Sequence, residues 1–417
     1  MNDNSRMNDF PSLTVPGSLP DPHSSSSSHS STPGTSAVTV QEKRRKRDGR
    51  KWLTLGRLWA LIVVSVGVLV FVLIGIPMPY VIEKPGPTFD VLAREAGTPL
   101  IDIGSDQATY TSTGELRMVT VSSFGGPGRT VTLSQLIEAY FDPSAVILKE
   151  SDVYPSDLTS DELDKISQAQ MEQSQSTSAV AALEELGYEV PAVVTISAAV
   201  PGSPAEGKVE DGDILRAITT PDGVRHEITS ASTTFSLPKT LEAGTPIILE
   251  VQRGDQTLTI ASETYRPDTM TPEESGSKFG IYLSVDAALP FPVTVHLEDV
   301  GGPSAGLIFA LGIIDELTGS TSVNGVSVAG TGAISYTGDV EPIGGIVQKM
   351  HGATRDGAAW FLAPVSNCDE VVGHVPAGLE VWPVATLKEA RHALELIRNG
   401  ATIDHPTCDA IVGDSTK

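Results

Sequence analysis

The sequence is short of basic residues and of cysteine. It holds 28 Lys and Arg against 52 Asp and Glu, which gives a formal net charge of −24 at pH 7. Duplex nucleic acid requires a clustered basic surface that neutralises phosphates, so this composition excludes nucleic acid as the main partner. The 2 cysteines form no Cys-x-x-Cys pair and no His/Cys cluster, so no metal site is predicted.

The sequence also lacks a complete nucleotide-binding loop. Residues 202–208 spell Gly-x-x-x-x-Gly-Lys, but Val209 stands where a phosphate loop has the Ser or Thr that holds Mg²⁺. The next residues, Glu-Asp-Gly-Asp, are typical of a turn and not of a helix N-terminus. We therefore predict no nucleotide, no ATP-driven motor and no other cofactor.

One long apolar run lies near the N-terminus. Leu58 to Ile76 contain no charge, and at about 1.5 Å per residue they match the ~30 Å hydrocarbon core of a bilayer. The leader in front, residues 1–57, is longer than that of a cleaved signal, so a retained transmembrane helix is predicted. The leader is Ser-rich, predicted to be disordered, and basic just before the span. By the positive-inside rule it is cytoplasmic, and residues 83–417 lie outside a cell membrane crossed once.

The outer region divides into segments that differ in composition and in hydrophobic pattern. Residues 83–187 mix strand-like and helical runs, which predicts an α/β collar. Residues 188–262 alternate short β-rich runs with turns, and the Gly-rich residues 275–400 carry the residues suited to chemistry. Residues 401–417 are predicted to be a C-terminal tail. The expected class is therefore a multidomain α+β protein.

Cys368 and Cys408 are the two cysteines of the chain. In a compartment outside the cytoplasm they could form one disulfide that closes a loop of about forty residues. The alternative is a pair of buried free thiols. In either case we expect a structural role for them and not a catalytic one.

Residues 201–215 resemble the core of a bacterial PDZ domain. They contain Pro-Gly-Ser-Pro-Ala and then Gly-Asp-Ile-Leu. The resemblance implies a β-sandwich or barrel-like domain in which a bound peptide adds a strand to an exposed sheet edge. In such domains a Gly-hydrophobic-Gly-hydrophobic loop holds the peptide carboxylate, and the best match is Gly187-Tyr188-Glu189-Val190. Glu189 departs from that pattern and would repel a free C-terminus, so a PDZ domain that only packs against its neighbours is the alternative.

A serine is predicted at a strand-to-helix turn. The alternating run 293–297 leads into Val-Gly-Gly-Pro-Ser-Ala-Gly at 300–306, and a helical run follows over 307–317. Ser304 thus lies at a helix N-terminus, where the dipole and free N–H groups favour negative charge. This makes Ser304 a candidate nucleophile, which needs a base to take its proton.

Two interpretations supply that base. In the first, Gly302 to Gly306 form the Gly-x-Ser-x-Gly elbow of an α/β-hydrolase, whose partners follow as Asp and then His. The residues that satisfy this order are Asp339 or Asp356, followed by His374 or His392. No oxyanion segment of the type found in that fold precedes the serine, which weakens the interpretation.

The second interpretation uses Lys349, which lies in a helical run with apolar neighbours. Burial lowers the pKa of a lysine because water no longer stabilises the charge, so the neutral amine can act as a base. His296 and His351 flank the two candidates in sequence. By the alternation of the strand and the spacing of the helix we assign both to structure.

Four sequence blocks in order resemble the proteolytic domain of Lon proteases. They are Gly-Gly-Pro-Ser-Ala-Gly at 301–306, Ala-Gly-Thr-Gly at 329–332, Gly-Asp-Val-Glu-Pro-Ile-Gly-Gly at 338–345 before Lys349, and Leu-Ala-Pro at 362–364 before Asn367. The resemblance implies that Ser304 is the nucleophile, Lys349 the general base and Thr331 the residue that orients the lysine. It also implies a supporting role for Gly302, Pro303 and Ala305. Gly301 and Ala333 depart from the pattern, which usually has Asp and Glu there.

With one span and a PDZ-like segment in front, the chain resembles the bacterial membrane-anchored PDZ–Lon peptidases, including the helix that carries Met171, Ser174 and Gln175. The resemblance implies an ATP-independent serine endopeptidase that cleaves unfolded or membrane-associated proteins outside the cytoplasm. Its partners would be protein or peptide substrates and the membrane, and Lon domains often form homo-oligomers. A catalytically silent peptide-binding protein is the alternative.

Overall fold

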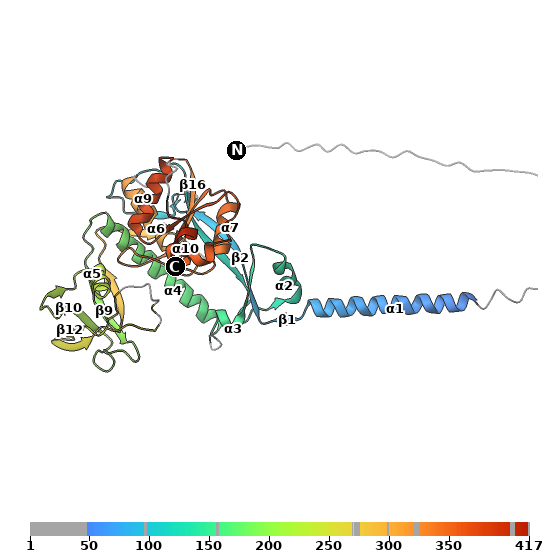
Figure 1. Cartoon of the computed structure of the whole chain (residues 1–417), viewed down its shortest axis with the longest axis horizontal. Coiled ribbons are helices and arrows are strands. Elements are labelled where there is room, and N and C mark those ends of the chain that lie inside the picture. The colour runs from blue at the N-terminus through green and yellow to red at the C-terminus, as the bar shows by residue number, and fades with distance from the viewer. Residues whose placement is uncertain are drawn as a thin grey trace, which may run out of the picture. The chain divides into compact units, whose positions relative to one another are not determined.

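The computed structural model describes residues 48–95, 98–155, 158–268, 270, 276–297, 300–319, 323, 325–400 and 405–415 (Figure 1). The predicted disordered leader lies largely outside the described residues, which begin at Asp48. The chain divides into two units between Val68 and Leu69. The described fold is mixed α+β, as predicted, while the proposed domain boundaries stay a prediction.

Helix α1 (Asp48–Ile74) contains the predicted span. It begins at Asp48 and not at Leu58, because no proline interrupts the polar residues before the apolar run and the helix continues through them. The segment Gly56–Ile74 has a mean hydropathy of 2.6, and none of it is buried inside the protein. By length and composition this helix could cross a membrane.

A six-stranded sheet forms the centre of the larger unit. Its strand order is β20-β19-β16-β6-β2-β8. Strands β6, β16, β19 and β20 are parallel, whereas β2 is antiparallel to both of its neighbours. The bounds are β2 (Tyr80–Asp90), β6 (Glu115–Phe124), β8 (Val146–Lys149), β16 (Ser327–Gly330), β19 (Trp360–Pro364) and β20 (Glu380–Val384).

This sheet contains strands from two of the predicted segments. Strands β2, β6 and β8 come from the segment predicted to form the collar, yet β6 pairs with β16 from the predicted protease segment. A parallel pair joins strands that are distant in the chain, so local sequence patterns could not reveal the pairing of β6 with β16. Residues 83–187 and 275–400 therefore build one sheet together.

Helices cover both faces of the sheet. Successive residues of a strand point to opposite faces. Accordingly Val328 and Leu362 belong to the core on the side of α6 (Gly306–Thr318), and Ala329 and Phe361 belong to the core on the side of α7 (Ile346–Arg355). Helices α4 (Ser160–Glu185) and α9 (Leu387–Arg398) pack against α6. Residues 306–315 of α6 are all buried, so this helix is the centre of the core.

A second sheet has the order β13-β12-β10-β9-β14, with β11 beside β10. All its pairs are antiparallel. It extends past residue 262, the predicted end of the PDZ-like segment, because β14 pairs with β9 along its length. The bounds are β9 (Ala192–Ala199), β10 (Asp213–Thr219), β11 (Arg225–Glu227), α5 (Ala231–Ser236), β12 (Pro246–Arg253), β13 (Gln256–Glu263) and β14 (Ile281–Ala287), with a 3₁₀ helix at Leu237–Thr240.

The remaining elements are short. Strand β1 pairs with β7, β3 with β4, β5 with β15 and β17 with β18. Their bounds, with those of the small helices, are β1 (Pro77–Met78), β3 (Arg94–Glu95), β4 (Thr98–Pro99), β5 (Ile101–Ile103), β7 (Val131–Thr132), α2 (Leu133–Tyr140), α3 (Glu150–Val153), β15 (Val293–Val295), β17 (Ala333–Ile334), β18 (Val340–Glu341), α8 (Cys368–Val371) and α10 (Cys408–Ser415), with a 3₁₀ helix at Val365–Asn367.

A disulfide joins Cys368 and Cys408. It ties α10, which lies in the segment predicted to be a tail, to α8 beside the sheet. Both sulfur atoms lie within the core on the α7 side. The end of the chain is thus a packed helix over its described residues, because the bridge and apolar residues such as Ile411 and Val412 hold it there.

We expect Gly312→Ala to destabilise the protein although alanine favours helices. A Cβ atom at this position of α6 would lie 2.5 Å from Ile101 Cδ1 and 3.0 Å from Val91 Cγ2. Such overpacking costs about 1–3 kcal/mol, more than the ~1 kcal/mol gained in helix propensity. Guanidinium unfolding followed by circular dichroism measures the difference. Gly413→Ala in α10, where an added Cβ atom would meet nothing within 4 Å, is the control and should not destabilise.

Candidate active site

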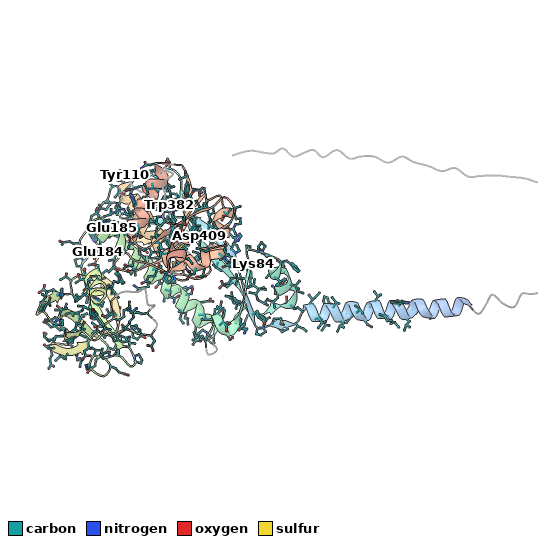
Figure 2. The ribbon with its side chains drawn as sticks, in the orientation of Figure 1. Lys84, Tyr110, Glu184, Glu185, Trp382 and Asp409 are labelled. Atoms are coloured by element: carbon teal, nitrogen blue, oxygen red, sulfur yellow. A yellow bond between two sulfur atoms is a disulfide. The ribbon has the colours of Figure 1, made fainter. Side chains whose placement is uncertain are left out.

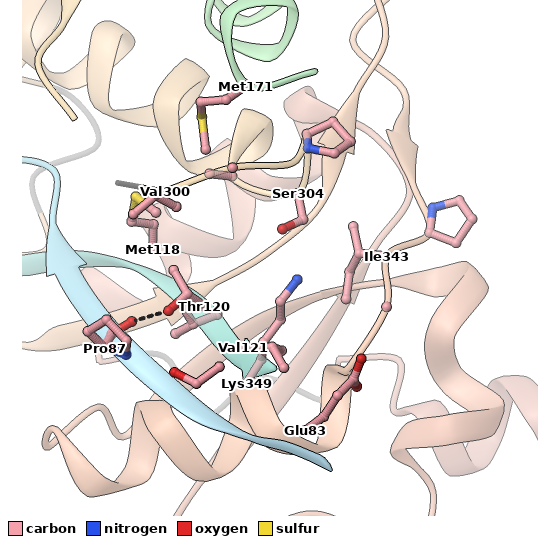
Figure 3. A pocket seen from close by; sticks show the side chains of 17 residues that line it. Glu83, Pro87, Met118, Thr120, Val121, Met171, Val300, Ser304, Ile343 and Lys349 are labelled. Atoms are coloured by element: carbon pink, nitrogen blue, oxygen red, sulfur yellow. Dashed lines mark hydrogen bonds between the residues drawn. The ribbon is translucent and has the colours of Figure 1, made fainter. Parts of the chain in front are cut away.

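Ser304 and Lys349 line one cavity of about 670 Å³. Figure 3 shows the Ser304 hydroxyl and the Lys349 amine pointing toward each other across it. Strands β2 and β6, helix α4, and the loops before α6 and α7 provide the other walls. The apolar part of the lining consists of Pro87, Met118, Val119, Val121, Met171, Val300, Pro303, Ala305, Pro342 and Ile343.

Helix α4 holds the serine turn in place. Gly302 N–H donates to Ser167 O at 2.9 Å, and the Ser174 hydroxyl donates to Pro303 O at 2.9 Å. One turn further, the buried Ser178 hydroxyl donates to Gly306 O at 2.9 Å. Two carbonyl groups of the turn, those of Pro303 and Gly306, therefore accept hydrogen bonds from α4, a helix from the segment that the sequence assigned to the collar.

The same helix explains the glycine at position 301, where the Lon pattern usually has Asp. A Cβ atom on Gly301 would overlap with Ser167 Oγ and lie 2.9 Å from Ser167 Cβ. A larger residue would therefore require Ser167 to shift. Gly302, next in the turn, has a φ of +85°, a conformation that glycine adopts without a steric cost.

Thr331 connects the serine turn to the lysine. Its hydroxyl donates to Ser304 O at 2.9 Å and accepts from Lys349 Nζ at 3.2 Å. The Gly332 N–H also donates to Ser304 O at 2.9 Å. Thr331 is fully buried, so both hydrogen bonds are shielded from water.

The Lys349 amine is almost completely buried, with 3% of the residue exposed. Burial lowers the pKa of Lys349 from 10.5 to about 7, and the charge of Glu83 opposes this shift. An amine with this pKa is neutral in a large fraction of molecules near pH 7. It can then accept a proton from a neighbouring hydroxyl.

Glu83 is a cavity residue that sequence reasoning missed. It lies on β2 and is half-buried, and its carboxylate is drawn with the cavity in Figure 3. Burial raises the pKa of the Glu83 carboxyl, and the Lys349 amine counteracts that rise in part. No local sequence pattern links it to Ser304, because the strand pairing of β2 with β6 brings it to the cavity.

The structure brings none of the Ser–His–Asp candidates to the serine. Asp339 is bonded to Ser335, Thr337 and Lys239, and Asp356 pairs with Arg355 and accepts from Thr88. The exposed residues His374 and His392 contact Glu370 and Glu395 instead. Among the described residues that line the cavity there is no histidine, including His296 and His351.

The predicted carboxylate-binding loop has another role in the structure. Gly187 N–H and Tyr188 N–H donate to Glu184 O and Leu183 O, which caps the end of α4. Val190 is buried in the core around α6, and the Tyr188 ring packs edge to face on Phe291. Gly187, Tyr188 and Glu189 are exposed. The loop leads into β9, which pairs with β10 on one side and β14 on the other, so residues 187–190 do not flank an open sheet edge.

An open edge is found at β14 instead. This strand ends the sheet order, so within the described residues one of its edges is unpaired. It follows Phe279, which is buried, and Gly280, whose φ is +75°. The signal that could have revealed it is the sequence Phe-Gly-Ile-Tyr at 279–282, a glycine between apolar residues directly before an alternating strand.

Comparison with known proteins places the serine and lysine in a named family segment. Residues 278–395 match the family described as Lon protease (S16) C-terminal proteolytic domain. The chain is 38% identical over 97 residues to Lon protease of Azospirillum brasilense, covering 22% of this chain and 12% of that protein. It is 32% identical over 121 residues to Lon protease 2 of Bacillus subtilis, covering 29% of this chain and 20% of that protein.

The chain thus spans no more than a fifth of the length of these relatives. Among solved structures, the PDZ domain of the SdrC-like protein from Listeria innocua covers 22% of this chain and 92% of its own, at 16% identity and a TM-score of 0.19. The corresponding domain from Listeria monocytogenes covers 22% and 85%, at 18% identity and a TM-score of 0.18. The family match supports a serine peptidase.

We expect Lys349→Met to abolish part of the pH dependence of stability. The unfolded chain holds a proton on Lys349 up to pH 10.5, and the folded chain releases it near 7. Since the unfolded state binds more protons between these values, the free energy of unfolding rises with pH there, by up to about 1.4 kcal/mol per pH unit. Guanidinium unfolding at pH 7 and 9 measures the rise. An unchanged rise in the Met variant would show that the folded lysine keeps an ordinary pKa.

We expect Glu83→Gln to lower the pKa of Lys349, because the carboxylate stabilises the ammonium form. Nuclear magnetic resonance of ¹³Cε-labelled lysine, titrated with and without the substitution, reports this pKa without reference to activity. The control is Glu138→Gln on α2, whose carboxylate pairs with Lys84 at the surface. A Lys349 titration that is the same in both variants would contradict an effect of Glu83.

Proposed function

We propose that this protein is a membrane-anchored serine endopeptidase that acts without ATP and uses Ser304 and Lys349 as a catalytic dyad. The observation that carries the proposal is the buried amine of Lys349, with a pKa of about 7, which points at a serine hydroxyl across a cavity. The match of residues 278–395 to a Lon-type proteolytic domain supports it independently.

In the mechanism, the neutral Lys349 amine accepts the Ser304 proton while the serine oxygen attacks the scissile carbonyl. The backbone N–H groups of Ser304 and Ala305 donate to no other described residue, and they lie at the start of α6. They are the proposed donors to the oxyanion. The Lys349 ammonium then protonates the leaving amine, and the same amine activates the water that hydrolyses the acyl-enzyme.

The strand β6 offers a place for the substrate backbone. Its pairing with β16 ends at Met118, whereas its pairing with β2 continues to Phe124. Among the described residues, the segment 119–124 therefore has no strand partner on the β16 side, and Thr120, Val121 and Ser122 of this segment line the cavity. An extended peptide could hydrogen-bond there as an added strand, which requires a substrate that is locally unfolded.

A second cavity supports cleavage within a chain and not only at its end. It has a volume of about 720 Å³ and shares Met171, Val300 and Gly301 with the first. Its lining is more polar and includes Arg129, Asp164 and Glu172. A peptide bound at Ser304 can therefore continue into this space beyond the apolar cavity, as an endopeptidase substrate does.

The membrane and compartment assignments follow from α1 and the disulfide. A single apolar helix long enough to span a bilayer supports an anchor, and the basic residues before it support a cytoplasmic N-terminus. The Cys368–Cys408 bridge supports an oxidising compartment for the larger unit. Independence from ATP rests on the lack of a nucleotide-binding loop in the sequence.

The second sheet is proposed to bind peptides at the free edge of β14 and to act on the active site. Its helix α5 stacks Phe235 on Tyr336, with ring centroids 5.2 Å apart. In the adjoining 3₁₀ helix, Lys239 bonds to Thr337 at 2.8 Å and pairs with Asp339. Both contacts are made to residues 336–339, which follow Thr331 in the chain. A peptide that moves α5 can therefore alter the hydrogen bond between Thr331 and Lys349.

We expect Ser304→Ala and Lys349→Arg each to reduce cleavage of a loosely folded protein such as casein by at least about 10³-fold, without ATP. Arginine keeps the positive charge but cannot give up its proton, so it tests the base and not the charge. His392→Ala, at the exposed candidate of the Ser–His–Asp hypothesis, is the control and should keep full activity. Loss in the His392 variant would contradict the dyad. Casein binding without cleavage by the wild type would favour the silent peptide-binding protein.

A further inference from the structure

The C-terminal end of α2 carries an exposed apolar patch formed by Ile137, Tyr140 and Phe141. Tyr140 and Phe141 are each 77% exposed, more than any other large hydrophobic residue that the structure describes outside α1. The value for Phe71 on α1 itself is 80%. Side chains three and four positions apart lie on one face of a helix, so Ile137, which is 49% exposed, joins the two rings.

The patch is distinct from the face by which α2 packs on the protein. Leu136 and Ala139 of that face are buried in a small core with Ile82 and Val131. The Tyr140 and Phe141 rings contact each other edge to face, with centroids 5.3 Å apart, so they form one surface. Leaving such side chains in water forgoes about 1.5–3 kcal/mol each, which favours a partner that covers them.

The start of α2 is held next to the residues that follow α1. Strand β1, which follows α1, pairs with β7, which precedes α2, in the register Met78 with Val131. In addition Leu133 N–H, the first of α2, donates to Ile76 O at 3.2 Å. At about 1.5 Å per residue, the patch lies about 6–12 Å along the helix from Leu133.

That distance is comparable with the depth of the interfacial layer. The polar regions of a bilayer add about 5–8 Å on each side of the hydrocarbon core. Tyrosine and tryptophan concentrate in this layer, because each side chain combines an apolar ring with one polar group. A patch of Tyr, Phe and Ile tethered at the last residues of a membrane span therefore fits the lipid surface itself.

We infer that Ile137, Tyr140 and Phe141 insert into the interfacial layer of the membrane that α1 crosses, which gives the outer region a second point of attachment. The inference rests on the proposed membrane span. Two carboxylates lie beside the patch: Glu138 pairs at 3.0 Å with Lys84, which is labelled in Figure 2, and Asp142 accepts from Ser144. The fitting lipid is therefore zwitterionic, and no anionic headgroup is required.

The attachment has a consequence for the active site. Lys84, which pairs with α2, is adjacent in β2 to Glu83, which lines the catalytic cavity. Docking of α2 would therefore hold β2 and the cavity at a fixed height above the bilayer. Segments of membrane-tethered proteins close to the surface are then the substrates within reach.

Spin labelling of the full chain in phosphatidylcholine vesicles tests this inference. Both cysteines are bridged, so a nitroxide attaches only to an introduced cysteine. The labels are placed at Phe141→Cys in the patch, at Val70→Cys in the span, and at Val224→Cys, which is 47% exposed on the second sheet. Collisions with oxygen, which concentrates in lipid, and with a water-soluble nickel chelate report the depth of each label.

The expected ratio of oxygen to nickel collisions at Phe141 is at least about fivefold higher than at Val224, as befits an interfacial position. Adding Ile137→Asp should return it toward the value at Val224. A Phe141 label as open to nickel as Val224, with the Val70 label in lipid, overturns the inference and leaves the span intact. A Val70 label in water overturns both. If the Phe141 label is protected from nickel only when several chains share a vesicle, and not at one chain per vesicle, the patch binds a second copy of the chain and the lipid assignment is overturned.

Discussion

The burial of one lysine amine is the constraint on which the proposed chemistry depends. Lys349 cannot keep a full charge at 3% exposure without a counterion in direct contact, and its pKa therefore falls to about 7. The structure compensates with two weak partners: the hydroxyl of Thr331 and, further away, the half-buried carboxylate of Glu83. A stronger partner would restore the charge and remove the base. The same burial that is a cost to folding is thus what makes the amine reactive.

This arrangement requires segments from most of the larger unit. The lysine comes from α7, the serine from the turn before α6, and Thr331 from the loop after β16. The segment before residue 188 contributes the remainder, because α4 binds the carbonyl groups of Pro303 and Gly306 while β2 and β6 form part of the cavity wall. The match to a Lon-type proteolytic domain begins only at residue 278. The part of the chain that builds the candidate active site is therefore larger than the segment that the family comparison recognises.

The second sheet is connected to this unit both along the chain and in space. Strand β14 belongs to the second sheet, and the chain passes from it through β15 to the serine turn. Independently, Phe235 and Lys239 contact the loop at 336–339. A peptide at the edge of β14 would thus have two routes to the catalytic residues, one through the backbone and one through packed side chains.

The sequence by itself determined the apolar run and the glycine-rich turn that presents Ser304, and four ordered blocks predicted Lys349 as the partner of that serine. These features depend on local patterns: a run without charge, a glycine-rich turn before a helix, and a lysine among apolar residues. The sequence also suggested residues 187–190 as a peptide loop and residues 83–187 as a collar, and neither suggestion could include the contacts that these segments make with distant parts of the chain. Whether a short motif caps a helix, or whether a strand joins one sheet or another, depends on what lies against it. Only the tertiary structure decided that β2 brings Glu83 to the lysine, that Ser167 lies against Gly301, and that β14 is an edge strand, because each is set by contacts between segments far apart in the chain.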